Sequence, residues 1–545
     1  MILEGPSISN QTCKQQVPAA LELAQLIVYN SVNHARPHSE QQHATKQVRH
    51  RRQQETPFPL YAGLYLYAKT RKAQIVSRMS KLGVSVSYDR ILSLTSDLAS
   101  TVSETYKRQQ VVCPPQLHKD VFTVGAVDNI DHNPTSTSAK GSFHGTAISL
   151  MQHPMADSMT HQSTVTFTSS KKKSLVLPEY YTAVDAVMLK SVEPDVPEIM
   201  TQIPGDSHLL PSATAHEYAW LNFVRLYVAS GCHAADANLT WSAFNSQAHP
   251  RVQKSTSCAV TGLLPLFREA SNSVAMIKHA MDVIAVAIEH LNSGQTPVMA
   301  CDQPLYALAK IIQWNFPELY GESRFVIMLG GLHVEMAGLK ALGSFMSGSG
   351  WVEAITDAGL CKPGTAESFL SAAHVRHCRR AHEVTAASLY VLQQRAFASY
   401  KTSCSEMTET LSFDDWHSRQ MSAQPQFAFW TLVLECELAV FAFVRSIRSA
   451  NFQQYIASLQ NLVPWFFIMD RTHYARWLPV HIRDMVELQH SNPGVFQEFS
   501  RGRFTVNKTN RSFSAIAIDH AHEQINATVK GDGGVIGLTE SENAL

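Results

Sequence analysis

The sequence predicts an α/β protein that is predominantly helical, with a sheet core interrupted by large helical insertions. Two β-rich stretches lie close together within residues 120–155, and a strand–helix–strand–helix pattern spans 297–343. The long region 351–492 has almost only helical periodicity. The chain of 545 residues is too long for one compact core, so two to four domains, or one domain with large insertions, are expected.

The N-terminal part is predicted to consist of a disordered basic tail over residues 1–55 and a helical region over 56–110. Its basic cluster, in HATKQVRHRRQQ, consists of Lys46, Arg49, Arg51 and Arg52. Their polar surroundings are typical of a solvated segment, and a nuclear-import signal or a phosphate-contacting arm are the functional alternatives. In 56–110, apolar residues recur at helical spacing and Ser87 is suited to cap a second helix. These helices fit either a structural hairpin or a DNA-reading pair.

The sheet is predicted to lie within residues 111–340. DVFTVGAVDNID alternates like a strand that ends in acids, and FHGTAISLMQHP follows as a second strand after a turn-rich link. TPVMACD, QPLYALAKIIQWNF and RFVIMLGG form a β–α–β pattern, which favours parallel strands covered by helices on both faces. Residues 156–212 are expected to be irregular and 213–295 mostly helical. A helical insertion is expected over 341–510, and a C-terminal catalytic helix with a tail over 511–545.

Composition limits the class of protein. The 45 basic residues balance the 45 acidic ones, so a DNA-binding surface would have to be local. Nine cysteines without a CxxC pair indicate reduced intracellular thiols, and no secretory signal is expected at the start of the chain. The longest apolar stretch, FAFWTLVLECELAVFAFVRSI, contains Glu435 and Glu437, which are costly at bilayer depth, so a buried helix is expected there.

Three acidic residues are placed as a two-metal phosphoryl-transfer site requires. Asp128 ends the first predicted strand, Asp302 ends a later one, and Glu523 lies on the last predicted helix. Carboxylates suit Mg²⁺ or Mn²⁺, and two such ions stabilise both the attacking and the leaving oxygen. Asp131 is a further candidate metal ligand, and His522 is a candidate to orient Glu523 or a phosphate. The structural alternative is that Asp302 caps a helix and Asp128 belongs to an ordinary turn.

Two other segments are candidates for nucleic-acid contact. AAHVRHCRRAHE presents Arg376, Arg379 and Arg380, for which phosphate contact is predicted, ahead of a zinc site made of His374, Cys378 and His382. MDRTHYARWLPVHIRDM is predicted to line a nucleic-acid channel, with a buried hydrogen-bond network as the equal alternative. Its candidate residues are His473, Arg476, Trp477 and Arg483.

Eight distinctive sequence blocks extend over most of residues 56–540. They are SYDRILSL (87–94), VVCPPQL (111–117), AVDNIDHNPTSTS (126–138), FHGTAISL (143–150), PVMACDQPLYALAK (297–310), MLGGLHVEMAGLKALG (328–343), MDRTHYARWLPVHIRDM (469–485) and DHAHEQINATVKGDGGVIGLTE (519–540). In these blocks the chain resembles a poorly characterised family of transposon-derived eukaryotic proteins, which are related to transposases with an RNase H-like (integrase-like) core. The resemblance implies a mixed sheet with acids on its first strand, after a later strand and on a terminal helix. Asp128, Asp302 and Glu523 follow that order.

The resemblance also implies a function, with one departure. It implies metal-dependent DNA nicking or strand transfer by an intracellular, nuclear protein whose partner is DNA and which does not bind membranes; a homo-oligomer is left open. Some relatives carry an acid before the histidine of the second strand, where this chain has Gly330-Gly331-Leu332-His333. If that acid is the second ligand, the chain is a catalytically inactive DNA-binding or protein-interaction module that keeps the fold.

Overall fold

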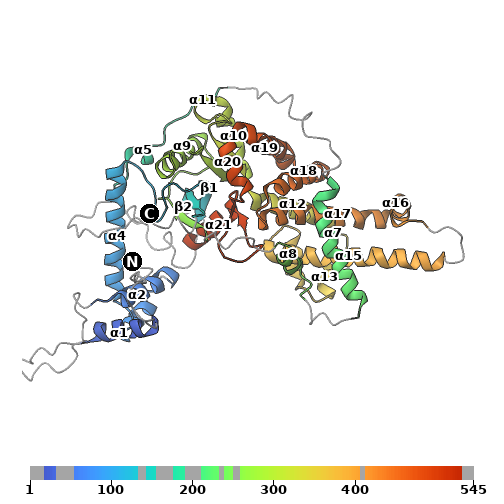
Figure 1. Ribbon diagram of the computed structural model, residues 1–545, viewed down its shortest axis with the longest axis horizontal. Helices are drawn as coiled ribbons and strands as arrows, with labels where there is room; N and C mark the ends of the chain where they lie inside the picture. Colours follow the sequence, from blue (N-terminus) through green and yellow to red (C-terminus); the bar gives the residue numbers. More distant parts are fainter. Residues whose placement is uncertain are drawn as a thin grey trace, which may run out of the picture.

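A five-stranded mixed sheet lies at the centre of a mostly helical protein (Figure 1), which confirms the predicted α/β class. The computed structural model describes residues 18–31, 55–70, 72–132, 143–154, 176–190, 210–231, 238–249, 258–404 and 411–530. The basic cluster Lys46–Arg52 and the glycine-rich segment after Lys530 therefore lie outside the described residues.

The sheet has the order β3-β2-β1-β4-β5. Its strands are β1 (Thr123–His132), β2 (Phe143–Gln152), β3 (Val260–Leu263), β4 (Val298–Cys301) and β5 (Val326–Leu329). The long β1–β2 hairpin and the β2–β3 pair are antiparallel, while β1–β4 and β4–β5 are parallel. The predicted β–α–β unit is thus present, with α10 (Gln303–Asn315) and the short α11 (Pro317–Tyr320) joining β4 to β5.

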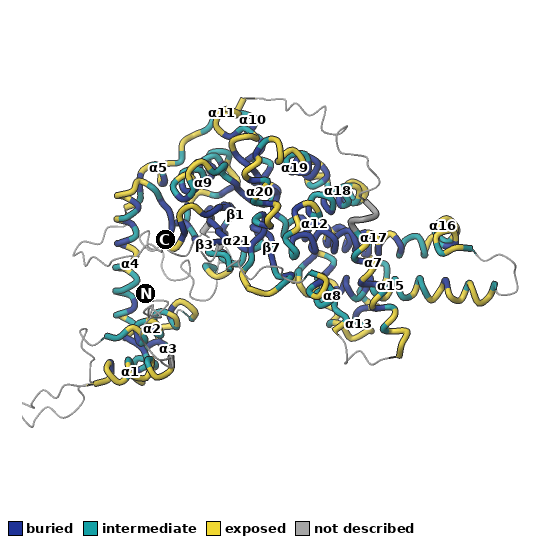
Figure 2. The backbone as a smooth tube through the Cα atoms, in the orientation of Figure 1, coloured by how far each residue is buried: buried dark blue, intermediate teal, exposed yellow. Residues whose placement is uncertain are grey.

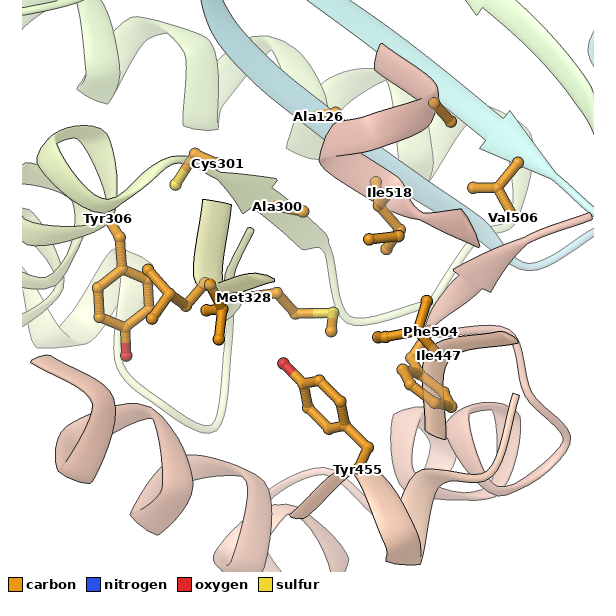
Figure 3. Packing of buried hydrophobic residues seen from close by; sticks show 14 of the residues in the cluster. Ala126, Ala300, Cys301, Tyr306, Met328, Ile447, Tyr455, Phe504, Val506 and Ile518 are labelled. Atoms are coloured by element: carbon orange, nitrogen blue, oxygen red, sulfur yellow. The ribbon is translucent and has the colours of Figure 1, made fainter. Parts of the chain in front are cut away.

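Helices cover both faces of the sheet, as the β–α–β pattern predicts. Gly125 of β1 lies so close to α9 (Val274–Leu291) that a Cβ at this position would be 2.8 Å from the Ile284 side chain. Because side chains alternate along a strand, Ala126 points to the opposite face, where α21 (Ile518–Lys530) packs (Figure 3). Ala300, Met328 and Ile518 lie on this second face.

The N-terminal helices form a small core of their own at one end of the molecule (Figure 1). They are α1 (Pro18–Asn30), α2 (Pro57–Thr70), α3 (Ala73–Lys81) and α4 (Tyr88–Gln109). The prediction of a disordered tail over 1–55 is wrong for α1. Its apolar side chains include Tyr29, which is buried and donates a hydrogen bond to the Ser85 carbonyl oxygen, so tertiary packing orders this helix.

The helical insertion predicted for 341–510 is also present, and it begins within the helix that directly follows β5. Its helices are α12 (Gly331–Met346), α13 (Trp351–Asp357), α14 (Pro363–Phe369), α15 (Val375–Ser403), α16 (Phe413–Ala423), α17 (Pro425–Arg448), α18 (Phe452–Ile468), α19 (Thr472–Ser491) and α20 (Pro493–Ser500). The chain then forms the two-stranded pair β6 (Thr505–Val506) and β7 (Ile516–Ala517) before α21. Before α9 lie α5 (Glu179–Thr182), α7 (Leu210–Ala229) and α8 (Trp241–Ala248).

Helix α17 is the central element of the helical part. Among the described residues it is the one helix that is long and apolar enough to cross a membrane by length and composition. Most of it is nevertheless buried against α7, α12, α15 and α18 (Figure 2). The stretch was predicted to be a buried helix, and the packing agrees with that prediction.

Candidate active site

Register brings two of the predicted acids to the same level of the sheet. Val127 of β1 pairs with Cys301 of the parallel strand β4, so the next residues, Asp128 and Asp302, lie side by side. Strand β1 continues to His132, with Asp128 paired to Ala147 of β2, so the prediction that Asp128 ends its strand is wrong. Residues paired in this way have side chains on the same face. This placement depends only on the parallel alignment of β1 and β4, although about 170 residues separate the two acids along the chain.

The third predicted acid reaches Asp128 from α21. Helix α21 packs across β1, and Glu523 shares a side-chain hydrogen bond with Asp128, which requires a proton between the two carboxyl groups. Burial, this hydrogen bond and the charges of Glu523 and Asp302 together raise the pKa of Asp128 to about 8. Repulsion between neighbouring carboxylates is therefore relieved by a proton near neutral pH.

Asp302 has a double role in the structure. Its side chain accepts a hydrogen bond from the Leu305 backbone N–H at 3.1 Å, so it caps α10, as the structural alternative predicted. Burial and the charges of Asp519 and Glu523 raise its pKa, against the lowering effects of the Leu305 N–H and of His333. Capping fixes the orientation of this carboxylate but leaves it within the electrostatic reach of the other acids.

Asp519 and His333 belong to the same cluster, although neither was among the predicted site residues. Asp519 accepts hydrogen bonds from the backbone N–H groups of Leu332 and His333, and its carboxylate lies 3.0 Å from His333 Nδ1. Burial acts to lower the pKa of His333, but Asp519, Asp302 and Asp128 outweigh it and raise the pKa to about 9. The imidazolium thus places a positive charge among these acids.

Gly330 permits this arrangement, which gives the departure in the Gly330-Gly331 motif a structural reason. A Cβ at Gly330 would lie 2.4 Å from Asp519 Oδ2, a distance that excludes any side chain unless Asp519 moves. Gly331 is similarly constrained, because its Cβ would lie 2.9 Å from the Cβ of Ala517. The carboxylate of Asp519 therefore occupies the space that a side chain at position 330 would need.

His522 is buried and contacts the sheet. Its Nδ1 lies 2.5 Å from Ser149 Oγ on β2, and burial lowers its pKa to about 4. The neutral ring therefore joins α21 to β2. Among the described residues, no hydrogen bond between His522 and Glu523 is found. Its predicted role in orienting Glu523 has no support in these contacts.

The capacity of the cluster to hold a metal ion rests on its oxygen donors. Asp128, Asp302 and Glu523 offer carboxylate oxygens, which hard cations prefer. Over the described ranges, no three His, Cys, Asp or Glu side chains already stand in the geometry of a metal centre. The backbone of Asp131 pairs with His144 in the β1–β2 hairpin, and its side chain lies outside the described residues.

The predicted basic face of α15 is close to this cluster. Arg379 forms an ion pair with Glu335 of α12 at 2.5 Å, and Arg380 pairs with Glu383 at 2.8 Å. Arg376 is exposed. The predicted zinc ligands diverge, because His374 is exposed whereas the Cys378 thiol is buried against the Phe369 carbonyl oxygen.

The candidate residues of α19 separate into two groups. His473 and Arg476 are exposed, and His473 lines a cavity of about 400 Å³ that also includes His333. Trp477 instead stacks on Trp314, with ring centroids 6.0 Å apart.

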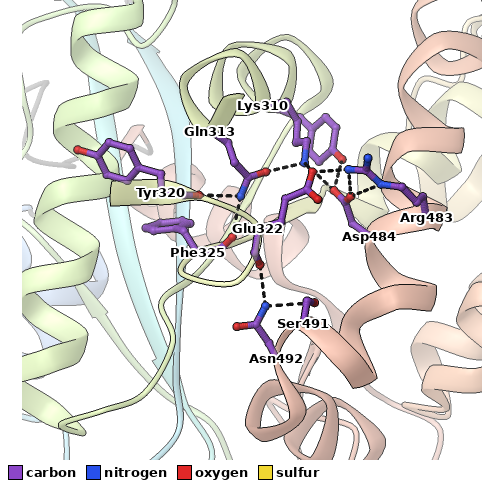
Figure 4. A network of polar contacts seen from close by, with 10 residues as sticks. Lys310, Gln313, Tyr320, Glu322, Phe325, Arg483, Asp484, Ser491 and Asn492 are labelled. Carbon is purple, nitrogen blue, oxygen red and sulfur yellow. Dashed lines mark hydrogen bonds and ion pairs between the residues drawn. The ribbon is translucent and has the colours of Figure 1, made fainter. Parts of the chain in front are cut away.

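Arg483 is part of a network that joins α10 to α19 (Figure 4). The buried Lys310 contributes the ammonium group, which lies 2.8 Å from Asp484 and 2.9 Å from Glu322. Arg483 forms ion pairs with the same two acids. Trp477 is therefore packed against another ring, and Arg483 belongs to a hydrogen-bond network. These positions agree with the alternative of a buried network predicted from the sequence for this segment.

Comparison with known proteins identifies one family. The family model for a domain of unknown function, DUF8702, matches residues 240–422 and 393–545, which together are more than half of the chain. No curated protein and no solved structure matches the chain. The matched region contains Asp302, Asp519 and Glu523, whereas Asp128 lies before it.

Proposed function

The chain belongs to the DUF8702 family, and we propose that it is a transposase-like enzyme that nicks or transfers DNA strands by metal-dependent phosphoryl transfer. The proposal rests chiefly on one observation. Asp128 and Glu523 are hydrogen-bonded to each other, and Asp302 leaves the neighbouring strand at the same level. Three carboxylates from distant parts of the chain thus lie within electrostatic range of one another beside the carboxyl end of β4, and sites form at such strand ends in open α/β sheets.

The topology supports an RNase H-like core for this site. The strand order β3-β2-β1-β4-β5, with an antiparallel half followed by a parallel half, places the first acid on the central strand. The last acid lies on a helix that follows a long helical insertion and packs on that strand. This is the arrangement implied by the sequence resemblance to transposon-derived proteins.

The donor set fits Mg²⁺ or Mn²⁺, with Asp128, Asp302 and Glu523 as the residues that would hold it. Such an ion supplies charge neutralisation at the phosphate and activates a water or a DNA 3′-hydroxyl. Burial and the negative charge of its neighbours raise the pKa of Asp128, and a bound cation would compensate that negative charge in place of a proton.

The surrounding residues would orient the reacting groups. The Leu305 N–H fixes one oxygen of Asp302, and Asp519 anchors the start of α12 so that His333 stays beside the acids. The His333 imidazolium offers a positive charge next to the position of a scissile phosphate, where negative charge builds up during transfer.

Nicking of supercoiled plasmid in the presence of Mn²⁺ tests the proposal. We expect Asp128→Asn, Asp302→Asn and Glu523→Gln each to reduce nicking by at least about a hundred-fold, because charge stabilisation at the phosphate is lost. The matched control variants are Asp357→Asn and Glu487→Gln, whose side chains are exposed and far along the chain from these acids. Wild-type activity in the three variants would refute the proposal.

A second candidate function is a catalytically inactive DNA-binding or protein-interaction module. One observation favours it, namely that the carboxylates of the described residues are not already arranged as a metal centre. Salt-sensitive DNA binding by a wild-type protein that does not nick any DNA in Mg²⁺ or Mn²⁺ would favour this module over the enzyme.

A further inference from the structure

A cavity of about 490 Å³ opens beside the start of α12, between α12, α15, α17 and α21. Its volume falls in the range of roughly 300–1,000 Å³ that small-molecule sites usually have. Four guanidinium groups line it: Arg376, Arg379, Arg380 and Arg448. Two carboxylates, Glu335 and Glu383, are the acidic side chains of its wall.

The positive charge of this cavity is only partly balanced. Each glutamate is engaged by one arginine, since Glu335 pairs with Arg379 and Glu383 with Arg380. Among the described residues, no hydrogen-bond or ion-pair partner is found for the exposed Arg376. The wall therefore has two more arginines than acids.

Arg448 is the second arginine without a carboxylate. Its guanidinium lies over the Phe513 ring, 4.5 Å from the centroid, and donates to Ser242 Oγ at 2.8 Å and to the Phe513 carbonyl oxygen at 3.2 Å. Burial and the charges of Arg379 and Arg376 lower its pKa to about 10, against the opposing charges of Glu383 and Glu335. Arg448 remains charged at neutral pH, so the cavity has a positive potential that an anion would relieve.

The cavity adjoins the acidic cluster through two elements. Leu332 lines it, and the same residue donates its N–H to Asp519. His520, the next residue after Asp519, also lines it and is within electrostatic range of Arg376 and Arg379. A chain-like anion that reaches the carboxylates at one phosphate would thus meet these arginines at a neighbouring phosphate.

We propose that this cavity binds a backbone phosphate of the DNA strand whose reacting phosphate lies at Asp128, Asp302 and Glu523. The inference rests on the proposed function, because that function places a DNA strand at the carboxylates. Guanidinium groups bind phosphate oxygens through paired, charge-assisted hydrogen bonds, and such contacts fix the register of a nucleic acid without reading its sequence. Arg376 and Arg448 supply the uncompensated charge, while Glu335 and Glu383 hold the other two arginines in place.

Fluorescence anisotropy with a labelled DNA duplex in Ca²⁺, and nicking in Mn²⁺, test the inference on the full chain. We expect Arg376→Gln to weaken binding by roughly ten-fold and to reduce the slope of log affinity against log salt by about one. Arg376→Lys keeps the charge and should retain most of the binding. Arg395→Gln removes an exposed arginine from the same helix, outside the cavity, and should bind DNA like the wild type.

Several outcomes would overturn the inference. They are a wild-type protein that does not bind the duplex, an Arg376→Gln variant that binds with unchanged affinity and slope, and an equal loss in Arg395→Gln. Inorganic phosphate at constant ionic strength separates the sources of the anion. Competition by phosphate that depends on Arg376, without an effect of Arg376→Gln on DNA binding, would assign the cavity to free phosphate and overturn the DNA assignment.

Failure of the proposed function gives a different pattern. If the wild type does not nick but binds DNA through Arg376, the enzyme proposal fails and the phosphate contact stands. If nicking depends on Asp302 but DNA binding does not depend on Arg376, the enzyme proposal stands and the cavity assignment fails. Circular dichroism of each variant checks that the fold is retained.

Discussion

At the scale of single residues, the candidate site depends on how a few side chains share charge. Asp128 keeps a proton because burial and then the neighbouring Glu523 and Asp302 raise its pKa, while His333 and two backbone N–H groups lower the pKa of the buried Asp519. Two acids of one cluster, Asp128 on β1 and Asp519 on α21, thus have opposite tendencies. The environment, and not the residue type, sets their roles. Asp128 is suited to exchange its proton for a cation, whereas Asp519 anchors the start of α12.

The raised pKa of Asp128 predicts a pH dependence of stability. Its ordinary pKa is 3.8 and its folded value is about 8, so the folded state binds more protons between these values. Stability should therefore fall as the pH rises from about 4 to about 8. In Asp128→Asn, which cannot ionise, this loss should be smaller, and the variant should melt a few degrees above the wild type near pH 8 in EDTA.

Thermal unfolding monitored by fluorescence, with and without Mn²⁺, checks this prediction. Mn²⁺ should raise the wild-type melting temperature most near pH 8, where Asp128 can release its proton, and should have little effect on Asp128→Asn. Asp357→Asn removes an exposed carboxylate and serves as the control. A wild type and an Asp128→Asn variant with the same pH profile would contradict the assignment of a shared proton.

The sequence predicted some residues of this cluster and missed others. Asp128, Asp302 and Glu523 follow visible patterns, namely predicted strand ends and a terminal helix, and register then brings them together. Asp519 and His333 were missed because their roles depend on a backbone approach at Gly330 that no local pattern encodes. The available signal was the four-residue spacing of Asp519 and Glu523, which places both on one face of a helix.

At the scale of secondary-structure elements, long periodic segments were predictable and short ones were not. The β1–β2 hairpin, the β4–α10–β5 unit and the helical insertion all follow hydrophobic periodicity. Strand β3 has only four residues and was placed within a helical region, because its pairing with β2 is non-local. Helix α1 was missed for a similar reason, since contacts with residues 83–85 order it.

The contact between α10 and α19 makes a prediction at this scale. Lys310 is fully buried, and Asp484 is its most buried acidic partner. Asp484→Ala should lower the free energy of unfolding by roughly 3 kcal/mol, because it leaves a buried ammonium group only partly compensated. The double variant Lys310→Met/Asp484→Leu should regain much of this loss, since apolar side chains need no partner.

Urea unfolding of the single and double variants measures both effects. Arg501→Ala provides the comparison, because it breaks a surface pair with Glu498 and should cost less than about 1 kcal/mol. An Asp484→Ala variant as stable as Arg501→Ala would show that Lys310 is not held by this network.

At the scale of the whole molecule, function and stability are distributed over separate parts. The net charge of zero hides a local contrast, with carboxylates on β1, at the end of β4 and on α21, and uncompensated arginines in the adjoining cavity. Stability is likewise divided, because the buried hydrophobic residues form two separate clusters. The larger one joins the sheet to the helical insertion, and the smaller one unites α1 to α4 around Ile91.

Two clusters predict two unfolding steps that different probes can separate. All eight tryptophans lie between Trp220 and Trp477, so tryptophan fluorescence reports on the larger cluster while far-UV circular dichroism reports on both. Ile91→Ala, which removes a fully buried side chain, should destabilise the smaller cluster by roughly 2–5 kcal/mol. It should therefore shift an early circular-dichroism transition and leave the tryptophan transition unchanged.

Leu459→Ala, in the larger cluster, should shift the tryptophan transition. Coincident shifts of both probes in Ile91→Ala would instead show that α4, which contributes to both clusters, couples them into one cooperative unit.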